Sequence, residues 1–257
     1  MPAIAPSLLL LAAAIVFAGG LVKGIAGFGY AIASTALLAT IFAPSTAVVL
    51  MILPMLVANV TLLRELDREA FTECLARFWP YGVAAMVGTL LGMALLNVIP
   101  TTALTTGLGI FTLGYVAATQ QRYELPGEQF VTEHCFEDGV VAKSALGFVS
   151  GLVFGVSNVA VQVVAYLDSL SLDRSTFVGV LAMILVGISG IRIGLAWGFG
   201  MYQSGSLLLY SAFVSIPGIA GVTTGKYMRQ YIPDRCERGG VLVLLTVIGV
   251  RLLTRAT

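Results

Sequence analysis

Two glycine-rich stretches decide the fold of this chain: residues 20–29, GLVKGIAGFG, and residues 147–158, GFVSGLVFGVSN. Each stretch interrupts an apolar run and divides it into two short apolar pieces. A helix break at membrane depth frees backbone N–H and C=O groups, which must then face protein, water or a substrate. Paired, glycine-interrupted short segments in matching positions are the best sequence indication of a transporter's binding site. The two stretches therefore predict two matched helix breaks.

The composition of the chain places it in a membrane. It has 257 residues, of which 58% are hydrophobic and 11% charged, and its mean hydropathy is +0.96. A soluble domain has roughly 45–50% apolar and about 25% charged residues. Only helices and closed barrels span a bilayer, and the long continuous apolar runs favour helices. The net charge of +1 gives no excess that would indicate nucleic acid as a partner. We expect an all-α polytopic membrane protein in the lipid bilayer.

The apolar segments fall into two sets of five, separated by a polar linker at 120–139. The segments are 7–22, 25–43, 46–63, 79–98 and 101–119 in the first set, and 140–154, 156–170, 176–199, 207–224 and 239–253 in the second. This division predicts a first transmembrane repeat at 1–119, a cytoplasmic linker at 120–139 and a second repeat at 140–257. Each repeat is expected to hold one glycine-broken pair of short helices and three spanning helices.

Matched residues support a duplication. Four pairs lie 133 residues apart: Gly88 and Gly221, Gly92 and Gly225, Pro100 and Pro233, and Gly107 and Gly240. The GxxxG pattern at 20–24 also matches the one at 147–151, with an offset of 127, and Ser45-Thr46 matches Ser175-Thr176 with an offset of 130. An ordered series of this kind is hard to attribute to chance in a glycine-rich chain.

The charges of equivalent loops predict that the repeats are inverted. Loop 64–77 holds three arginines, whereas its counterpart 200–206 has no charge. Loop 97–100 is uncharged, whereas its counterpart 226–238 carries four basic residues. Under the positive-inside rule the basic loops and the linker are cytoplasmic. Both termini are then outside, although Arg251 and Arg255 count mildly against this orientation. Five crossings in each half, or three crossings and a re-entrant hairpin, satisfy the charges equally.

Candidate binding residues gather around the breaks. A helix that begins at a break presents free N–H groups to an anion, and the bidentate guanidinium of Arg192, deep in 176–199, fits an oxyanion. The alternative for Arg192 is that its side chain extends to the membrane interface. Lys23 adjoins the first break, where it supplies charge or reaches the membrane interface; the interface is the preferred interpretation. Glycines at the breaks serve either a site or tight helix contact. The predicted substrate-binding set is Gly24, Gly27, Phe28, Gly29, Asn59, Gly155, Ser157, Asn158, Gln162 and Arg192.

These motifs resemble those of the TauE/SafE sulfite-exporter family of membrane permeases. The resemblance is carried by Gly20-x-x-x-Gly24-x-x-Gly27-Phe28-Gly29, by the Gly147-Phe148-x-x-Gly151-x-x-x-Gly155 echo and by the layout in two halves. It implies export or uptake of a small sulfur-containing or carboxylate anion, such as sulfite, a sulfonate or sulfoacetate, across a bacterial or archaeal inner membrane. The second opening departs from the family pattern, because it reads Gly155-Val-Ser-Asn158 where consecutive glycines are usual.

Two other functions have less support. A membrane-embedded enzyme needs a nucleophile, an acid–base pair or a metal set. The apolar segments contain no His and no paired carboxylates, so we predict no catalytic residues, no metal and no cofactor. A non-transporting scaffold would gain nothing from two matched breaks. The sequence does not distinguish a monomer from a homodimer.

The topology can be tested with the cysteines. An impermeant thiol reagent should label Cys74, Cys135 and Cys236 only from the cytoplasmic side, because all three lie in the stretches assigned there. Labelling of Cys236 from outside, together with Cys74 from inside, contradicts the inverted arrangement.

Overall fold

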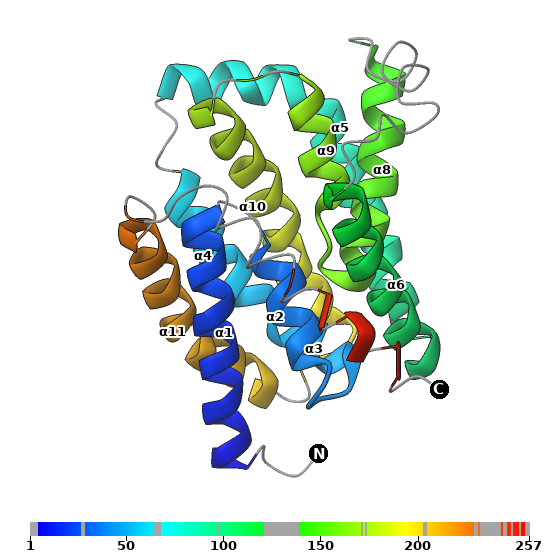
Figure 1. Cartoon of the computed structure of the whole chain (residues 1–257). Helices are drawn as coiled ribbons and strands as arrows, with labels where there is room; N and C mark the ends of the chain where they lie inside the picture. Colours follow the sequence, from blue (N-terminus) through cyan, green and yellow to red (C-terminus); the bar gives the residue numbers. More distant parts are fainter. Residues whose placement is uncertain are drawn as a thin grey trace.

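The fold is a helical bundle, seen in a computed structural model that describes residues 5–26, 29–63, 68–96, 98–120, 139–170, 172, 174–202, 205–228, 231 and parts of 243–254. All regular elements in this part of the chain are helices, which confirms the predicted all-α class. The helices are α1 (Pro6–Ala26), α2 (Tyr30–Leu38), α3 (Pro44–Leu50), α4 (Ile52–Leu63), α5 (Arg68–Leu96), α6 (Thr101–Gln120), α8 (Val140–Ser157), α9 (Val161–Ser169), α10 (Arg174–Gly198) and α11 (Ser206–Met228) (Figure 1).

Six stretches of the described chain are long and apolar enough to cross a membrane. They lie at Pro6–Ile25, Pro44–Leu63, Phe71–Leu96, Val140–Ser157, Thr176–Gly198 and Ser206–Met228. α2 and α9 have nine residues each, which at 1.5 Å per residue extend to about half of a bilayer's hydrocarbon core. The chain is therefore a multi-pass membrane protein in which two short helices follow full-length ones. The prediction that both helices of each glycine-broken pair are short was wrong for α1 and α8, because both helices continue through their glycines to a length that can span the bilayer.

The principal helix contacts join the two halves of the sequence. α1 packs along α11, α5 packs along α8, and α10 lies between α4 and α5. Figure 1 shows the α1–α11 pair and the α5–α8 pair on opposite sides of the bundle. Each of these two pairs takes one helix from the first predicted repeat and one from the second.

Glycines make both pairs possible, because the backbones touch where a side chain would otherwise stand. A Cβ atom on Gly24 of α1 would lie 2.7 Å from the Cα atom of Gly225 in α11. A Cβ atom on Gly155 of α8 would lie 3.0 Å from the Cα atom of Gly92 in α5. Small residues that allow such close approach are typical of helix interfaces in lipid.

The packing supports a different register for the GxxxG patterns. Gly24 contacts Gly225, and Gly155 makes the equivalent contact with Gly92, so Gly24 corresponds to Gly155 with an offset of 131. The sequence comparison used 127 instead, which is one helical turn away. The two offsets differ for a simple reason: Gly147, Gly151 and Gly155 are spaced one turn apart, so either neighbouring pair fits the pattern.

A helix interruption that the sequence analysis did not predict divides the segment 46–63 at Met51, between α3 and α4. Pro54 has no N–H and cannot donate to the carbonyl of Leu50 four residues earlier. The Ser211 hydroxyl of α11 donates to that carbonyl instead, at 2.7 Å. A residue from the second half thus satisfies a backbone group of the first.

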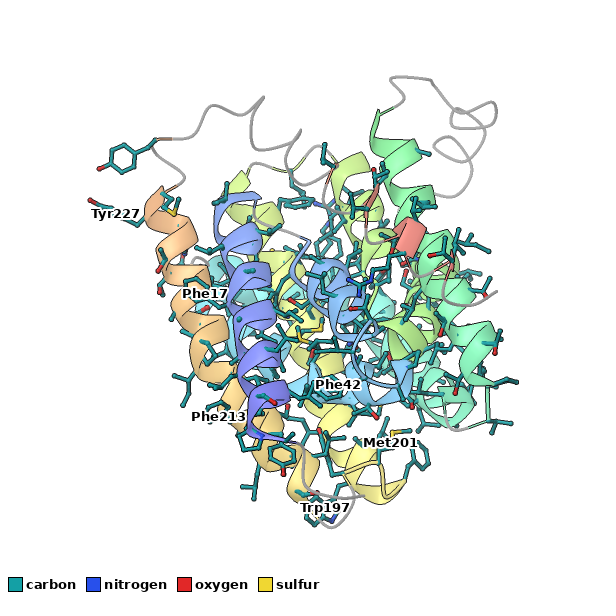
Figure 2. All side chains as sticks on the ribbon, turned by 60° about the horizontal axis from the view of Figure 1, so that its bottom comes forward. Phe17, Phe42, Trp197, Met201, Phe213 and Tyr227 are labelled. Atoms are coloured by element: carbon teal, nitrogen blue, oxygen red, sulfur yellow. The ribbon has the colours of Figure 1, made fainter. Side chains whose placement is uncertain are left out.

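The helix directions and two exposed aromatic residues define the two ends of the bundle. Figure 1 shows α1, α4 and α11 running upward and α10 running downward, with the N-terminus at the lower end. Trp197 and Tyr227 are both more than half exposed and lie at opposite ends of the bundle (Figure 2), as expected for aromatic residues at the two membrane interfaces. Which end faces the cytoplasm stays a prediction.

Two residues of the labelling test, Cys135 and Cys236, lie outside the described residues. Cys74 is buried, so a thiol reagent reaches it only when α5 moves from its neighbours. The test of topology therefore depends on Cys135 and Cys236.

The glycine contacts predict a difference between matched substitutions. A Cβ atom on Gly151 would lie 1.9 Å from the Ala85 carbonyl oxygen, whereas one on Gly114 of α6 meets no atom within 4 Å. Gly151→Ala should lower the free energy of unfolding by about 1–3 kcal/mol through overpacking. Gly114→Ala should be neutral or stabilising, because alanine is the better helix former. Thermal unfolding in detergent measures both variants, and equal melting temperatures contradict the assignment.

Candidate functional site

Both predicted helix breaks are present. α1 ends at Ala26 and α2 begins at Tyr30, with Gly29 at φ 87° as the N-cap. α8 ends at Ser157, Asn158 adopts the left-handed conformation at φ 62°, and α9 begins at Val161. Positive φ suits glycine, and asparagine tolerates it better than most residues. Gly27 and Phe28 fall in the first break, outside the described residues.

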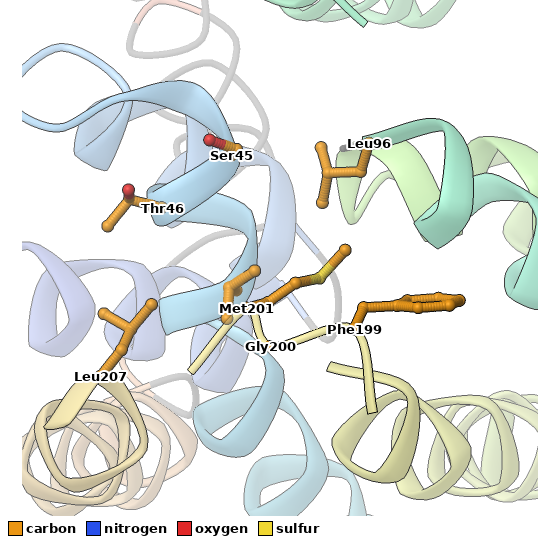
Figure 3. Close-up of a pocket in the computed structure, with 8 residues that line it drawn as sticks. Ser45, Thr46, Leu96, Phe199, Gly200, Met201 and Leu207 are labelled. Atoms are coloured by element: carbon orange, nitrogen blue, oxygen red, sulfur yellow. The ribbon is translucent and has the colours of Figure 1, made fainter. Parts of the chain in front are cut away.

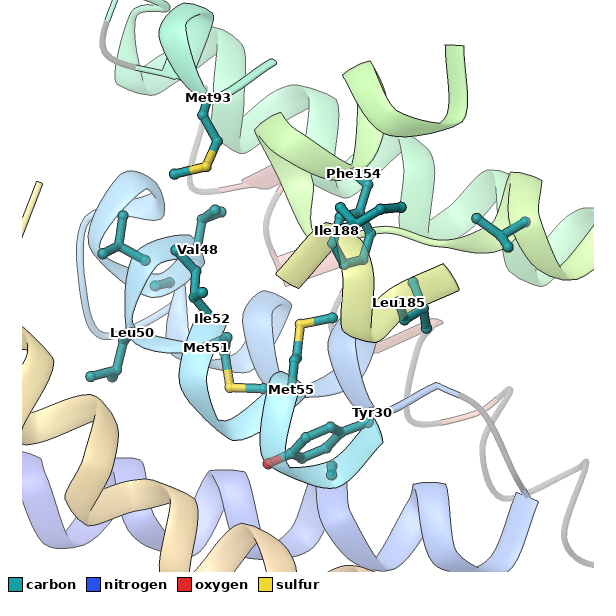
Figure 4. Close-up of a cluster of buried hydrophobic side chains, with 14 of the residues drawn as sticks. Tyr30, Val48, Leu50, Met51, Ile52, Met55, Met93, Phe154, Leu185 and Ile188 are labelled. Atoms are coloured by element: carbon teal, nitrogen blue, oxygen red, sulfur yellow. The ribbon is translucent and has the colours of Figure 1, made fainter. Parts of the chain in front are cut away.

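Arg192 of α10 is fully buried beside the second break. Its Nη1 donates to Oδ1 of Asn158, and its Nη2 lies 3.4 Å from the carbonyl oxygen of Gly155. Its guanidinium carbon lies 4.9 Å from the ring centroid of Phe154, within cation–π range. Phe154 and Ile188 pack together at this point of the core (Figure 4). The burial rules out the alternative in which Arg192 reaches the membrane interface.

Asn158 connects Arg192 to the first half of the chain. Its Nδ2 donates to the Thr35 hydroxyl of α2 and to the Val48 carbonyl of α3, both at 3.0 Å. One side chain at the break therefore holds α10, α2 and α3 together. Ser157 has a local role: its hydroxyl donates to the Val153 carbonyl at 2.7 Å and accepts from the Val159 N–H at 3.1 Å.

A second buried cation lies next to the first break. Lys23 of α1 is 7% exposed, and its Nζ donates to Oδ1 of Asn59 in α4 at 2.6 Å. The ammonium also lies 5.8 Å from the ring centroid of Tyr30. The preferred interpretation of Lys23 as an interfacial residue was therefore wrong. Asn59 provides a hydrogen-bond acceptor inside the bundle, so the lysine side chain is not extended to water at the interface.

The remaining predicted site residues, Gly24, Gly155 and Gln162, have different surroundings. Gly24 lies inside α1, where its missing side chain allows contact with α11, and substrate contact at this residue stays a prediction. Gly155 combines packing against Gly92 with a carbonyl near Arg192. Gln162 lies in α9, and its Oε1 is buried without a hydrogen-bond partner among the described residues. The structure thus groups Gly155, Ser157, Asn158 and Arg192, and places Asn59 with Lys23.

Two contacts of this site were not predicted. Thr35 stands in an apolar segment, and its polarity was the only available signal. The Val48 carbonyl gave no signal, because a backbone group becomes a partner of Asn158 only through the tertiary arrangement.

At each of the two buried cations, one buried N–H donor lacks a hydrogen-bond acceptor among the described residues. Nε of Arg192 and Nδ2 of Asn59 are buried and have no hydrogen-bond partner among the described residues. Neither Lys23 nor Arg192 forms an ion pair with a residue that the structure describes. Buried charges in membrane proteins are normally paired, and those that are not indicate a functional site. Positive charge and free N–H donors together are suited to an anion.

A cavity of about 210 Å³ lies at the end of the bundle opposite to Lys23. It is lined by Ser45, Thr46, Val49, Leu96, Phe199, Gly200, Met201 and Leu207. Figure 3 shows Ser45 and Thr46 on the α3 side, with Met201 and Phe199 on the α10 side. Val49 follows Val48, the residue whose carbonyl accepts from Asn158, so α3 leads from the cavity toward the Arg192 site.

Two substitutions separate the contribution of the Asn158 side chain from that of its backbone conformation. Asn158→Gly removes the hydrogen bonds to Arg192, Thr35 and Val48 but suits the positive φ. It should lower the free energy of unfolding by about 1–3 kcal/mol, because it leaves buried polar groups unpaired. Asn158→Ala should lose roughly a further 1 kcal/mol to backbone strain. Thermal unfolding of both variants is the measurement, and an unchanged Asn158→Gly contradicts the network.

Comparison with known proteins gives one result. The model of the family described as "Sulfite exporter TauE/SafE" matches residues 11–252, which include every helix discussed above except the first turn of α1. No curated protein and no solved structure matches the chain. The family match covers both breaks, both buried cations and the glycine-lined helix pairs. This chain belongs to the TauE/SafE sulfite-exporter family of membrane transporters.

Proposed function

We propose that this protein is a secondary carrier that moves a small oxyanion across the membrane by alternating access. The anion, of the sulfite, sulfonate or sulfoacetate class, binds at the second break between Arg192 and the start of α9. The membrane is the inner membrane of a bacterial or archaeal cell, with both termini outside. Transport, and no enzymatic reaction, is the activity.

The observation that carries this proposal is the complete burial of Arg192 without a carboxylate partner among the described residues. A buried charge is unfavourable unless it is paired and hydrogen-bonded. Asn158 and Gly155 supply two neutral oxygens, which partly solvate the guanidinium without neutralising it. An oxyanion at the free Nε would complete both the charge balance and the hydrogen bonding.

The break adds neutral donors to the same place. The first backbone N–H groups of α9 have no acceptor within the helix, as at every helix start, and they carry partial positive charge. They follow Asn158 by three residues. A tetrahedral or pyramidal oxyanion has several acceptor oxygens and uses such a mixed set of guanidinium and amide donors well.

The two helix pairs support alternating access by inverted repeats. α1–α11 and α5–α8 have equivalent glycine contacts, at Gly24–Gly225 and Gly155–Gly92. Two bodies of the same construction, held by close backbone contact, are suited to rock about a site between them. The cavity next to α3 then supplies the path from one end of the bundle.

A flux measurement tests the function. Protein reconstituted in liposomes should take up [³⁵S]sulfite or labelled sulfoacetate, and Arg192→Gln should bind the transported anion about 10- to 150-fold more weakly, from the loss of roughly 1.5–3 kcal/mol. Arg192→Lys should keep part of the activity, because it preserves charge but not the bidentate geometry.

Exposed Arg251 provides a matched control, and Arg251→Gln should transport normally. If neither anion moves in the wild-type protein, the substrate class is wrong. If Arg192→Gln leaves the affinity for the anion unchanged while Asn158→Ala lowers it, the anion binds at the second helix break without a contact to Arg192.

A further inference from the structure

We infer that the chain holds a second anion site at Lys23 and Asn59, in series with the Arg192 site. Its ligand class, a small oxyanion, rests on the proposed function. Lys23 was expected at the membrane interface, and the proposed transport step at Arg192 makes no use of it. The two cations come from opposite halves of the sequence.

The chemistry at Lys23 is that of an anion site. An ammonium group has three donors, and one of them is used by Oδ1 of Asn59 at 2.6 Å. Nδ2 of Asn59 is buried and has no hydrogen-bond partner among the described residues. Tyr30 covers the ammonium with its ring, which attracts a cation but supplies no net charge. Donors are therefore in excess, and a negative charge is missing.

The second site repeats the construction of the first. Lys23 and Arg192 each donate to an asparagine oxygen, of Asn59 and Asn158 respectively. Each lies near an aromatic ring, and each group leaves one buried N–H donor unpaired. A single unpaired donor has many structural explanations. Two buried cations with similar surroundings are better explained by a ligand of the same class at each of them.

The two sites lie at different levels of the bundle. Lys23 is three residues from the end of α1, and Asn59 is four residues from the end of α4. Both helices run upward in Figure 1. Arg192 is six residues from the end of α10, which runs downward. The Lys23 site is therefore nearer to the end where the basic stretches 64–77 and 226–238 begin.

Helix α2 connects the two sites. Tyr30 at its start lies beneath Lys23, and Thr35 accepts from Asn158 in the Arg192 group. Five residues of helix separate these contacts, which corresponds to roughly 7–8 Å along the axis. Two small anions fit at such a separation, one at each cation, and an anion leaving one site has the other within reach.

Equilibrium binding of [³⁵S]sulfite to the purified protein, under anoxic conditions, tests the inference. The wild-type protein should bind two sulfite ions per chain, and Lys23→Met and Arg192→Gln should each bind one. Lys226→Met is the matched control, since it removes an exposed lysine at the same end of the bundle, and it should bind two. Asn59→Leu keeps the Lys23 charge but removes the Nδ2 donor, together with the Oδ1 that accepts from Lys23, and it should weaken one of the two sites about tenfold. This variant carries the test if Lys23→Met does not fold.

The possible failures are distinguishable. One sulfite per wild-type chain, retained in Lys23→Met and lost in Arg192→Gln, overturns the second site and leaves the proposed function standing. One sulfite per wild-type chain, lost in folded Lys23→Met as well as in Arg192→Gln, places the two cations on one anion and also overturns the second site. No bound sulfite in the wild-type protein overturns both proposals for this anion.

Discussion

Inside a bilayer, a polar group must find its partner within the protein, and this constraint explains the most unusual contacts of the structure. Water is absent from the hydrocarbon region, so an unpaired backbone group there is strongly unfavourable. The Leu50 carbonyl, which loses its helical donor to Pro54, accepts from Ser211. The Val48 carbonyl accepts from Asn158. In both cases the donor comes from the other half of the chain, so the interruption between α3 and α4 depends on the association of the halves.

That association rests on backbone contact between glycines. Helices in lipid gain little from the hydrophobic effect when they meet, and close packing must provide the stability. At the contacts of Gly24 with Gly225 and of Gly155 with Gly92, no side chain separates the two helix backbones, so the helices approach each other closely. They create two helix pairs, and α4 and α10 lie between them. The polar residues Asn59 and Arg192 are carried by these central helices, where the pairs shield them from lipid.

The helix breaks connect this packing to the proposed binding site. Asn158 uses all of its polar side-chain atoms within the core, on Arg192, Thr35 and Val48. An anion at Arg192 would therefore act on a residue that also fixes α2 and α3. In a carrier, occupancy of the site must influence the relative positions of the helices around it, because a ligand shifts a conformational equilibrium only through its differential affinity for the two states. Asn158 provides a direct structural route for that influence.

Local pattern in the sequence was sufficient to predict the membrane class, the all-helical fold, both helix breaks and the position of Arg192 and Asn158 beside one of them. These features depend on hydropathy, on glycine spacing and on a charge within an apolar run, all of which are properties of neighbouring residues. The burial of Lys23, its bond to Asn59 and the packing role of Gly24 were decided by the tertiary structure. A lysine near the end of an apolar helix reaches water or remains inside according to whether another helix offers an acceptor, and a glycine lies in a contact or a site according to what faces it. Both facing groups here belong to segments distant in the sequence, Asn59 for Lys23 and Gly225 for Gly24, so no pattern around either residue could reveal them.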